Sequence, residues 1–165
     1  MSELNEIMLN DLTNELILRL REKKLTFGTA ESCTGGLISK TVTDIAGCSD
    51  VFLGGIVSYA NSVKEGLLGV DEKTLWAIGA VSPEVAMRMA LGAKEALGAD
   101  VTVAVTGIAG PGGGSHETPV GLVYIAVCHG DDKLVCEECR FDGTREEIRS
   151  AAAYRALSMA LDAIS

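Results

Sequence analysis

Apolar residues recur with a helical period in four stretches of the chain. They stand three or four positions apart, with charged residues between them, in residues 3–22, 36–46, 82–97 and 144–164. Ser82 and Thr144 are expected to cap the last two stretches, and Glu147 stands where it would complete a capping box with Thr144. The pattern therefore predicts four amphipathic helices.

Shorter helices are predicted between residues 60 and 79. Ser62 and Glu65 have the spacing of a capping box, which would place Lys64 in the first turn of a helix. Asp71 is expected to cap a second short helix that ends at Gly79.

Runs rich in apolar and β-branched residues predict strands at 25–31, 51–59, 101–105, 120–128 and 134–141. Residues 129–132 form a hairpin turn between the last two, and Gly54-Gly55 indicates a bulge or a close contact. Strands that alternate with helices, followed by a hairpin and a final helix, predict an α/β fold. We expect a three-layer α/β/α sandwich on a mixed, mainly parallel sheet of about five strands. The length of 165 residues fits one domain over 1–165.

Charge and hydropathy restrict the class of partner. The net charge of −9 argues against a nucleic acid, since binding to its backbone needs clustered Lys and Arg. No apolar run approaches the length of about 20 residues that a membrane span needs. The start of the chain, residues 1–6, is acidic where a signal peptide would be basic. We expect a cytoplasmic protein.

The five cysteines suit a reducing compartment, because they are odd in number and scattered. Cys136 and Cys139 have the spacing of a metal-binding pair, but they lie in a predicted strand, where residues three apart face opposite sides. We expect neither a metal nor another cofactor.

Ligands of open α/β sheets bind beyond the carboxyl ends of the strands, and three loops of this chain are predicted to lie there. The first, residues 29–36, contains Ser32 between an apolar strand and a helix start. Ser32 is a candidate nucleophile with backbone N–H donors beside it. The alternatives are a hydroxyl in a phosphate cradle, or a simple helix cap by Ser32 or Thr34.

The third loop, residues 106–115, is rich in glycine but matches neither a P-loop nor a dinucleotide fingerprint. Its N–H groups can cradle one phosphate or oxyanion, although glycine needed only for turns would look the same. The residues of both glycine loops that we expect to bind the substrate are Thr34, Gly35, Gly36, Thr106, Gly107, Ala109 and Gly110.

The second loop, residues 59–64, carries the candidate base. The positive end of a helix dipole and partial burial would both lower the pKa of Lys64, and a neutral lysine beside Ser32 would complete a Ser-Lys pair. Tyr59 could hydrogen-bond the Ser32 hydroxyl or relay its proton. A solvated lysine and a half-buried strand tyrosine are the alternatives.

Two arginines near the start of the last helix suggest an anion clamp. Arg145 directly follows the Thr144 cap, where a cation is unusual, and Arg149 lies one turn further along the same face. Arg145 is the better placed cation for a substrate phosphate. The alternative is a solvated helix face with salt bridges to neighbouring glutamates.

Six motifs distributed over nearly the whole chain resemble the C-terminal domain family of the competence-damage-inducible protein CinA. The sequence is most similar to its stand-alone members, the nicotinamide-nucleotide amidohydrolases (NMN deamidases, PncC type). The motifs are Thr29 to Gly36, Tyr59-Ala60-Asn61 with Lys64, Gly79 to Ser82, Thr106 to Pro111, Pro119-Val120-Gly121, and Gly143-Thr144-Arg145.

The resemblance implies an α/β/α domain that hydrolyses the carboxamide of nicotinamide mononucleotide (NMN) to nicotinate mononucleotide and ammonia, in pyridine-nucleotide salvage. It implies Ser32 as nucleophile and Lys64, assisted by Tyr59, as base. We expect a homo-oligomer, in the form of a dimer. Two other hypotheses are a nucleotide-binding module without catalysis and a hydrolase of another small amide or phosphorylated metabolite. The serine with a base favours the amidase, because phosphate binding alone needs no such pair.

Overall fold

Five strands pair side by side in the order β2-β1-β3-β4-β5. Their bounds are Phe27–Glu31 for β1, Phe52–Val57 for β2, Val101–Gly107 for β3, Leu122–His129 for β4 and Lys133–Arg140 for β5. β1 is parallel to β2 and to β3, whereas β4 is antiparallel to both β3 and β5. Only β4 therefore runs against the other four strands of the sheet, and the predicted mixed, mainly parallel sheet is confirmed.

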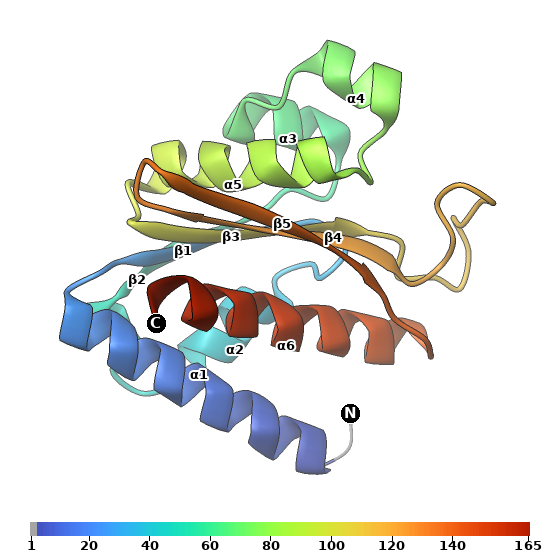
Figure 1. Cartoon of the computed structure of the whole chain (residues 1–165). Coiled ribbons are helices and arrows are strands. Elements are labelled where there is room, and N and C mark those ends of the chain that lie inside the picture. Colours follow the sequence, from blue (N-terminus) through green and yellow to red (C-terminus); the bar gives the residue numbers. More distant parts are fainter. Residues whose placement is uncertain (1–2) are drawn as a thin grey trace.

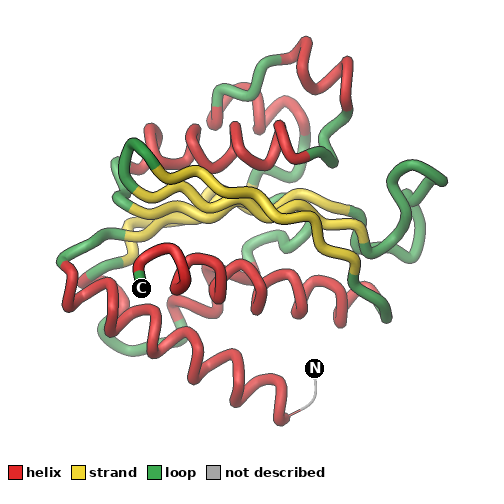
Figure 2. The backbone as a smooth tube through the Cα atoms, in the orientation of Figure 1, coloured by secondary structure: helices red, strands yellow, loops and turns green. Residues whose placement is uncertain are grey.

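The structure is a computed structural model that describes residues 3–165. Its helices are α1 (Glu3–Lys23), α2 (Leu37–Thr43), α3 (Asn61–Leu68), α4 (Glu72–Ile78), α5 (Pro83–Leu97) and α6 (Arg145–Ile164), with a 3₁₀ turn at Cys48–Asp50. Figure 1 and Figure 2 show α5, with α3 and α4 above it, on one face of the sheet and α1, α2 and α6 on the other. The three-layer α/β/α sandwich is confirmed.

Two hydrophobic clusters fill the spaces on either side of the sheet. Phe27, Leu16 and Leu157 belong to the cluster under α1, α2 and α6, whereas Ala30 and Met89 belong to the cluster under α5. β3 is buried over Val101–Thr106, as its continuous apolar and β-branched sequence predicts for a strand covered on both faces. Cys136 packs against the α5 cluster and Cys139 belongs to the other, so the predicted opposite orientation of the pair is confirmed.

The capping predictions have mixed outcomes. Thr144 and Glu147 form the predicted capping box of α6. The box predicted for Ser62 and Glu65 is wrong, because α3 starts two residues earlier than a Ser62 cap requires and Ala60 is its N-cap, with no side-chain hydrogen bond. Lys64 is consequently the fourth residue of α3, and its backbone N–H already bonds the Ala60 carbonyl at 3.2 Å.

The helix predicted over 36–46 is shorter than expected. It ends at Thr43, and Gly47, with φ of 82°, begins the 3₁₀ turn that follows. For Gly54-Gly55, both predicted roles, a bulge and a close contact, are confirmed. The β1–β2 register shifts between the pairs of Phe27 and Gly28, and a Cβ on Gly55 would collide with the hydroxyls of Thr29 and Ser39.

The first two residues of the acidic start lie outside the described part of the chain. Within residues 3–165, no helix combines the length and the apolar character needed to cross a membrane.

Gly92 sets how closely α5 can approach α3. A Cβ built on Gly92 would collide with the Leu68 carbonyl, which is backbone and cannot move aside. We expect Gly92→Ala to lower the free energy of unfolding by about 1–3 kcal/mol, the usual cost of overpacking. Gly66→Ala, in the interior of α3 with open space around the new methyl, is the matched control.

Gly66→Ala should be neutral or stabilise by up to about 1 kcal/mol, since alanine favours the helix over glycine. Urea denaturation of the two variants measures both effects. Equal stability of Gly92→Ala and Gly66→Ala would show that α3 and α5 separate without cost.

Candidate active site

Ser32 follows directly on β1 and opens a tight turn, residues 32–36, that leads into α2. Its backbone N–H donates to the Val105 carbonyl of β3 at 2.9 Å, so the end of the central strand pair fixes where the turn starts. Gly35 and Gly36 have φ of 59° and 97°, which is left-handed backbone that glycine adopts without a steric cost. The predicted glycine turn at a strand-to-helix junction is therefore present.

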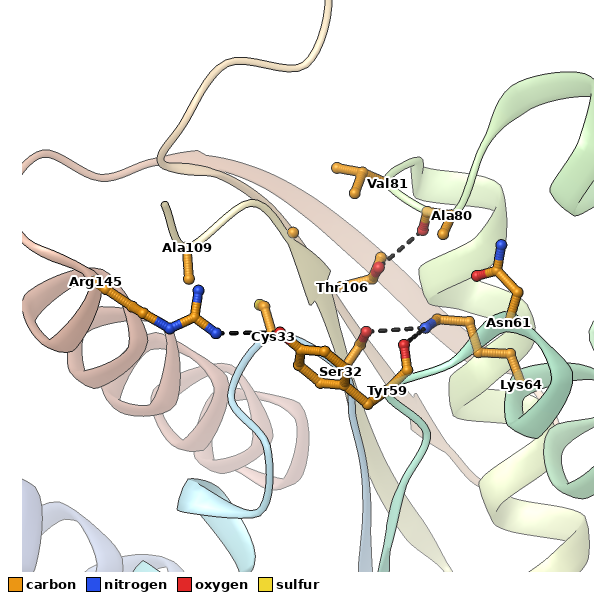
Figure 3. Close-up of a pocket in the computed structure, with 11 residues that line it drawn as sticks. Ser32, Cys33, Tyr59, Asn61, Lys64, Ala80, Val81, Thr106, Ala109 and Arg145 are labelled. Carbon is orange, nitrogen blue, oxygen red and sulfur yellow. Dashed lines mark hydrogen bonds between the residues drawn. The ribbon is translucent and has the colours of Figure 1, made fainter. Parts of the chain in front are cut away.

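The Lys64 side chain reaches Ser32 from α3. Its Nζ lies 2.9 Å from the Ser32 Oγ, 2.7 Å from the Ser58 carbonyl and 3.3 Å from the Tyr59 carbonyl. Lys64 is 1% exposed and Ser32 is 8% exposed, so the contact between them is shielded from bulk water. Figure 3 shows the two side chains pointing toward one another.

Burial lowers the pKa of the Lys64 amine, because desolvation disfavours the ammonium form, while a charged Cys33 thiolate would oppose that effect. Its contacts with protein groups are with two carbonyls and one hydroxyl, and no carboxylate pairs with it among the described residues. Burial thus shifts the amine toward its neutral form relative to a solvated lysine.

Cys33, the neighbour of Ser32, is buried as well. Desolvation raises the pKa of the Cys33 thiol to about 11, although Arg149 and Lys64 act in the opposite direction. A thiol with this pKa is protonated near neutral pH and is a poor nucleophile.

The three predicted loops meet around a cavity of about 200 Å³. Ser32 and Cys33, Tyr59 to Lys64, and Thr106 to Ala109 supply one wall each, and α6 supplies Arg145 (Figure 3). A cavity of this size is smaller than the range of about 300–1,000 Å³ that is typical for drug-sized ligands. It can enclose a ring-sized group and leaves the rest of a larger ligand at its mouth.

Tyr59 does not lie as predicted. Its hydroxyl accepts a hydrogen bond from an Arg145 Nη at 3.1 Å, and the part of Tyr59 that meets Lys64 is its backbone carbonyl. The side chain is 61% exposed at the rim of the cavity. The expected hydrogen bond from the Tyr59 hydroxyl to Ser32 is not among the contacts of the described residues.

Arg145 spans the mouth of the cavity. Besides Tyr59, it donates to the Gly110 carbonyl at 2.7 Å, which ties the glycine-rich loop to α6. The alternative, in which Arg145 and Arg149 form salt bridges to Glu146 and Glu147, is not found among the ion pairs between described residues. Arg149 instead donates to the Thr34 carbonyl at 2.7 Å.

The predicted binding residues divide into two groups. Thr106, Gly107 and Ala109 line the cavity, and the Thr106 hydroxyl donates to the Ala80 carbonyl at 2.8 Å. Thr34, Gly35, Gly36 and Gly110 do not line it.

The sequence prediction that the N–H groups at the start of α2 are free to bind a ligand is wrong. The backbone N–H groups of Gly36, Ile38 and Ser39 donate to the Glu31 carboxylate at 3.0, 3.0 and 2.8 Å. A substrate phosphate therefore finds this helix start already occupied by a buried carboxylate.

Sequence reasoning missed several residues of the site. Asn61, Ala80 and Val81 line the cavity, and Glu31 is fully buried directly before Ser32. An acidic residue inside an apolar strand was the pattern that could have revealed Glu31, because a buried carboxylate needs several donors. In the part of the chain that the structure describes, no three His, Cys, Asp or Glu side chains gather as a possible metal site.

Comparison with known proteins identifies relatives over almost the whole chain. The model of the CinA C-terminal domain matches residues 9–164. The chain is 48% identical to the nicotinamide-nucleotide amidohydrolase PncC of Enterobacter agglomerans, over 96% of each protein. It is 51% identical to a CinA-like protein of Leptospira borgpetersenii, over 92% of this chain and 36% of that protein. The chain thus spans about a third of the length of several curated relatives.

Solved structures that resemble this chain are also CinA-related proteins. The competence/damage inducible protein CihA from Agrobacterium tumefaciens superposes with a TM-score of 0.92 at 46% identity, over 95% of each chain. A CinA superfamily protein from Escherichia coli superposes with a TM-score of 0.91 at 32% identity, over 99% of this chain and 93% of that one. The chain belongs to the CinA C-terminal domain family.

Proposed function

We propose that this protein hydrolyses the carboxamide of nicotinamide mononucleotide to nicotinate mononucleotide and ammonia. The observation that carries the proposal is the buried contact of 2.9 Å between the Lys64 Nζ and the Ser32 Oγ. Phosphate binding alone requires no desolvated amine beside a serine. The relative named nicotinamide-nucleotide amidohydrolase supports the choice of substrate.

The two carbonyls around Lys64 determine the direction of its lone pair. A neutral amine has two N–H donors and one lone pair, and a carbonyl can only accept. The carbonyls of Ser58 and Tyr59 take both hydrogens, so the lone pair is left for the proton of the Ser32 hydroxyl. In this proposal Tyr59 assists the base through its backbone and not through its hydroxyl.

The reaction then proceeds in two halves. The Ser32 Oγ attacks the carboxamide carbon while its proton passes to Lys64. The resulting ammonium donates that proton to the leaving nitrogen, the C–N bond breaks, and ammonia leaves an ester on Ser32. Water attacks the ester with Lys64 again as base, and the carboxylate product leaves with Ser32 restored.

Backbone N–H groups of the turn are the proposed donors to the oxyanion. Glu31 uses those of Gly36, Ile38 and Ser39, so the groups of Cys33 and Thr34 are assigned to the developing charge. The cavity encloses the nicotinamide ring, with Thr106, Gly107 and Ala109 along its wall. Arg145 at the mouth binds the phosphate.

Purified protein incubated with NMN should release ammonia in step with nicotinate mononucleotide. Ser32→Ala should abolish turnover, because loss of a nucleophile of this kind costs up to roughly a millionfold in kcat, while NMN binding stays within about tenfold. Calorimetric titration of the variant measures binding. Loss of binding together with turnover would favour a phosphate cradle over a nucleophile.

The pH profile tests the role of Lys64. The active form is the neutral amine, and burial lowers its pKa, so kcat/KM should rise with pH through that lowered pKa and then level off. Lys64→Arg keeps a positive charge but cannot lose its proton, and it should be nearly as inactive as Lys64→Met. An arginine variant with most of the wild-type kcat would make Lys64 a binding cation and leave the base unassigned.

Arg145→Ala tests the phosphate site. Removing the guanidinium should raise KM for NMN more than KM for its dephosphorylated nucleoside, because only the nucleotide loses a charge-assisted hydrogen bond. Steady-state kinetics with both substrates measure the difference. Equal increases for the two substrates would remove Arg145 from the phosphate site.

Cys33 provides a test of the nucleophile, since its thiol lies beside Ser32. A pKa of about 11 keeps the thiol protonated at pH 7 to 8, so iodoacetamide should leave Cys33 unmodified in a peptide map. Cys33→Ala should retain kcat within about tenfold, in contrast to Ser32→Ala. Inactivation that follows alkylation of Cys33 would contradict the assignment of Ser32.

A further inference from the structure

Two charged side chains hold the turn of residues 32–36. Glu31, immediately before the turn, is fully buried and accepts hydrogen bonds from the N–H groups of Gly36, the last residue of the turn, and of Ile38 and Ser39 in α2. The Ser39 hydroxyl adds a fourth hydrogen bond at 2.7 Å. The Glu31 carboxylate therefore joins the start of the turn to its end and to the first turn of α2.

Arg149 holds the same turn from outside. It comes from α6, 115 residues further along the chain, and its Nη donates to the Thr34 carbonyl at 2.7 Å. The same nitrogen lies 3.4 Å from the point where Gly35 would carry a Cβ. Arg149 thus contacts the middle of the turn, whereas Glu31 joins its two ends.

Arg149 and Arg145 have different surroundings although they lie one helical turn apart. Arg145 is exposed, lines the cavity and bonds Tyr59 and Gly110 at its mouth. Arg149 is half-buried and does not line the cavity, and within the described part of the chain its hydrogen bond is to the Thr34 carbonyl of the turn. A ligand in the cavity therefore meets Arg145 and not Arg149.

The position of Arg149 is not explained by an ion pair. No carboxylate pairs with it among the ion pairs of the described residues, and its Nε is buried without a hydrogen-bond partner there. The buried Thr34 hydroxyl also lacks a partner. A half-buried guanidinium with an unsatisfied N–H lowers stability, so stability alone does not account for an arginine at this position.

We propose that Arg149 is a positioning residue that, together with Glu31, fixes the Ser32 turn, and that it is not a ligand of the substrate phosphate. This inference rests on the proposed function in that Ser32 is the reacting group. Two consecutive left-handed glycines leave the free turn many conformations, and the two charged side chains select the one in which Ser32 meets Lys64. A displacement of about 1 Å in a reacting atom can cost roughly a hundredfold in rate.

The kinetic test compares Arg149→Ala with wild type and with Arg155→Ala, which removes another α6 arginine that lies outside the site. Arg149→Ala should lower kcat for NMN roughly 10- to 100-fold with KM within about threefold. Its preference for the nucleotide over the nucleoside should not change. Arg149→Lys, which can still donate to the Thr34 carbonyl, and free guanidinium added to Arg149→Ala should each recover part of the kcat.

A second readout needs no substrate. A fluorophosphonate probe labels a reactive serine, and mass spectrometry gives the rate of labelling at Ser32. Arg149→Ala should label most slowly and Arg149→Lys at a rate between that of Arg149→Ala and wild type. Arg155→Ala should label at the wild-type rate. If circular dichroism shows that Arg149→Ala does not fold, Arg149→Lys, which keeps the charge, is used alone for this test.

The outcomes separate the two proposals. Unchanged kcat and labelling in the Arg149 variants, with a KM that rises for the nucleotide more than for the nucleoside, would make Arg149 a phosphate ligand and overturn the inference. Wild-type protein that labels at Ser32 but leaves NMN intact would refute the proposed substrate, and slower labelling in Arg149→Ala would still support the positioning role. A Ser32 that neither labels nor turns over NMN would overturn both.

Discussion

The site depends on the burial of one amine. Lys64 is 1% exposed, and removing an ammonium from water is so costly that a buried lysine is driven toward its neutral form. Its surroundings offer two carbonyls and a hydroxyl in place of a carboxylate, so they orient the amine without restoring its charge. The nearby features of the fold, from the β2–α3 loop to the packing of α3 on α5, serve to keep this side chain in place.

The order of the strands explains why these groups meet. β1, β2 and β3 are parallel neighbours, so the residues that follow them emerge at one edge of the sheet. Ser32, Ser58 and Thr106 come from those three carboxyl ends. α6 lies on the opposite face of the sheet from α5 (Figure 1). In its first turns, Arg145 donates to the Gly110 carbonyl and Arg149 to the Thr34 carbonyl, in the loops at the same edge.

Much of this arrangement could be predicted from the sequence, because the helices, strands and turns are marked by local patterns of apolar, capping and glycine residues. The helix and strand order, the Thr144 cap and the three loops follow from such patterns, whereas the pairing of Ser32 with Lys64 is implied by the resemblance to the CinA C-terminal domain family. The prediction of a Ser62 cap is wrong because the N-cap of α3 is Ala60, two residues earlier. The direction of the Tyr59 hydroxyl and the partner of Arg149 depend on contacts between segments far apart in the chain, which no local pattern encodes. The partners of Glu31 lie only five to eight residues away, but they depend on the path of the turn that follows β1.

The hydrogen bond from Arg149 to Thr34 joins residues 115 positions apart, and the cavity draws its walls from β3, α3, α6 and the loops that follow β1, β2 and α4. No short continuous fragment of the chain contains all of these groups. Enzymatic turnover is therefore a measure of the cooperative fold as a whole: a chain that has lost the docking of α6, even with its sheet intact, would lose the constraint on Ser32. Activity should disappear early in denaturation, ahead of the loss of helical circular dichroism, if α6 is the first element to detach.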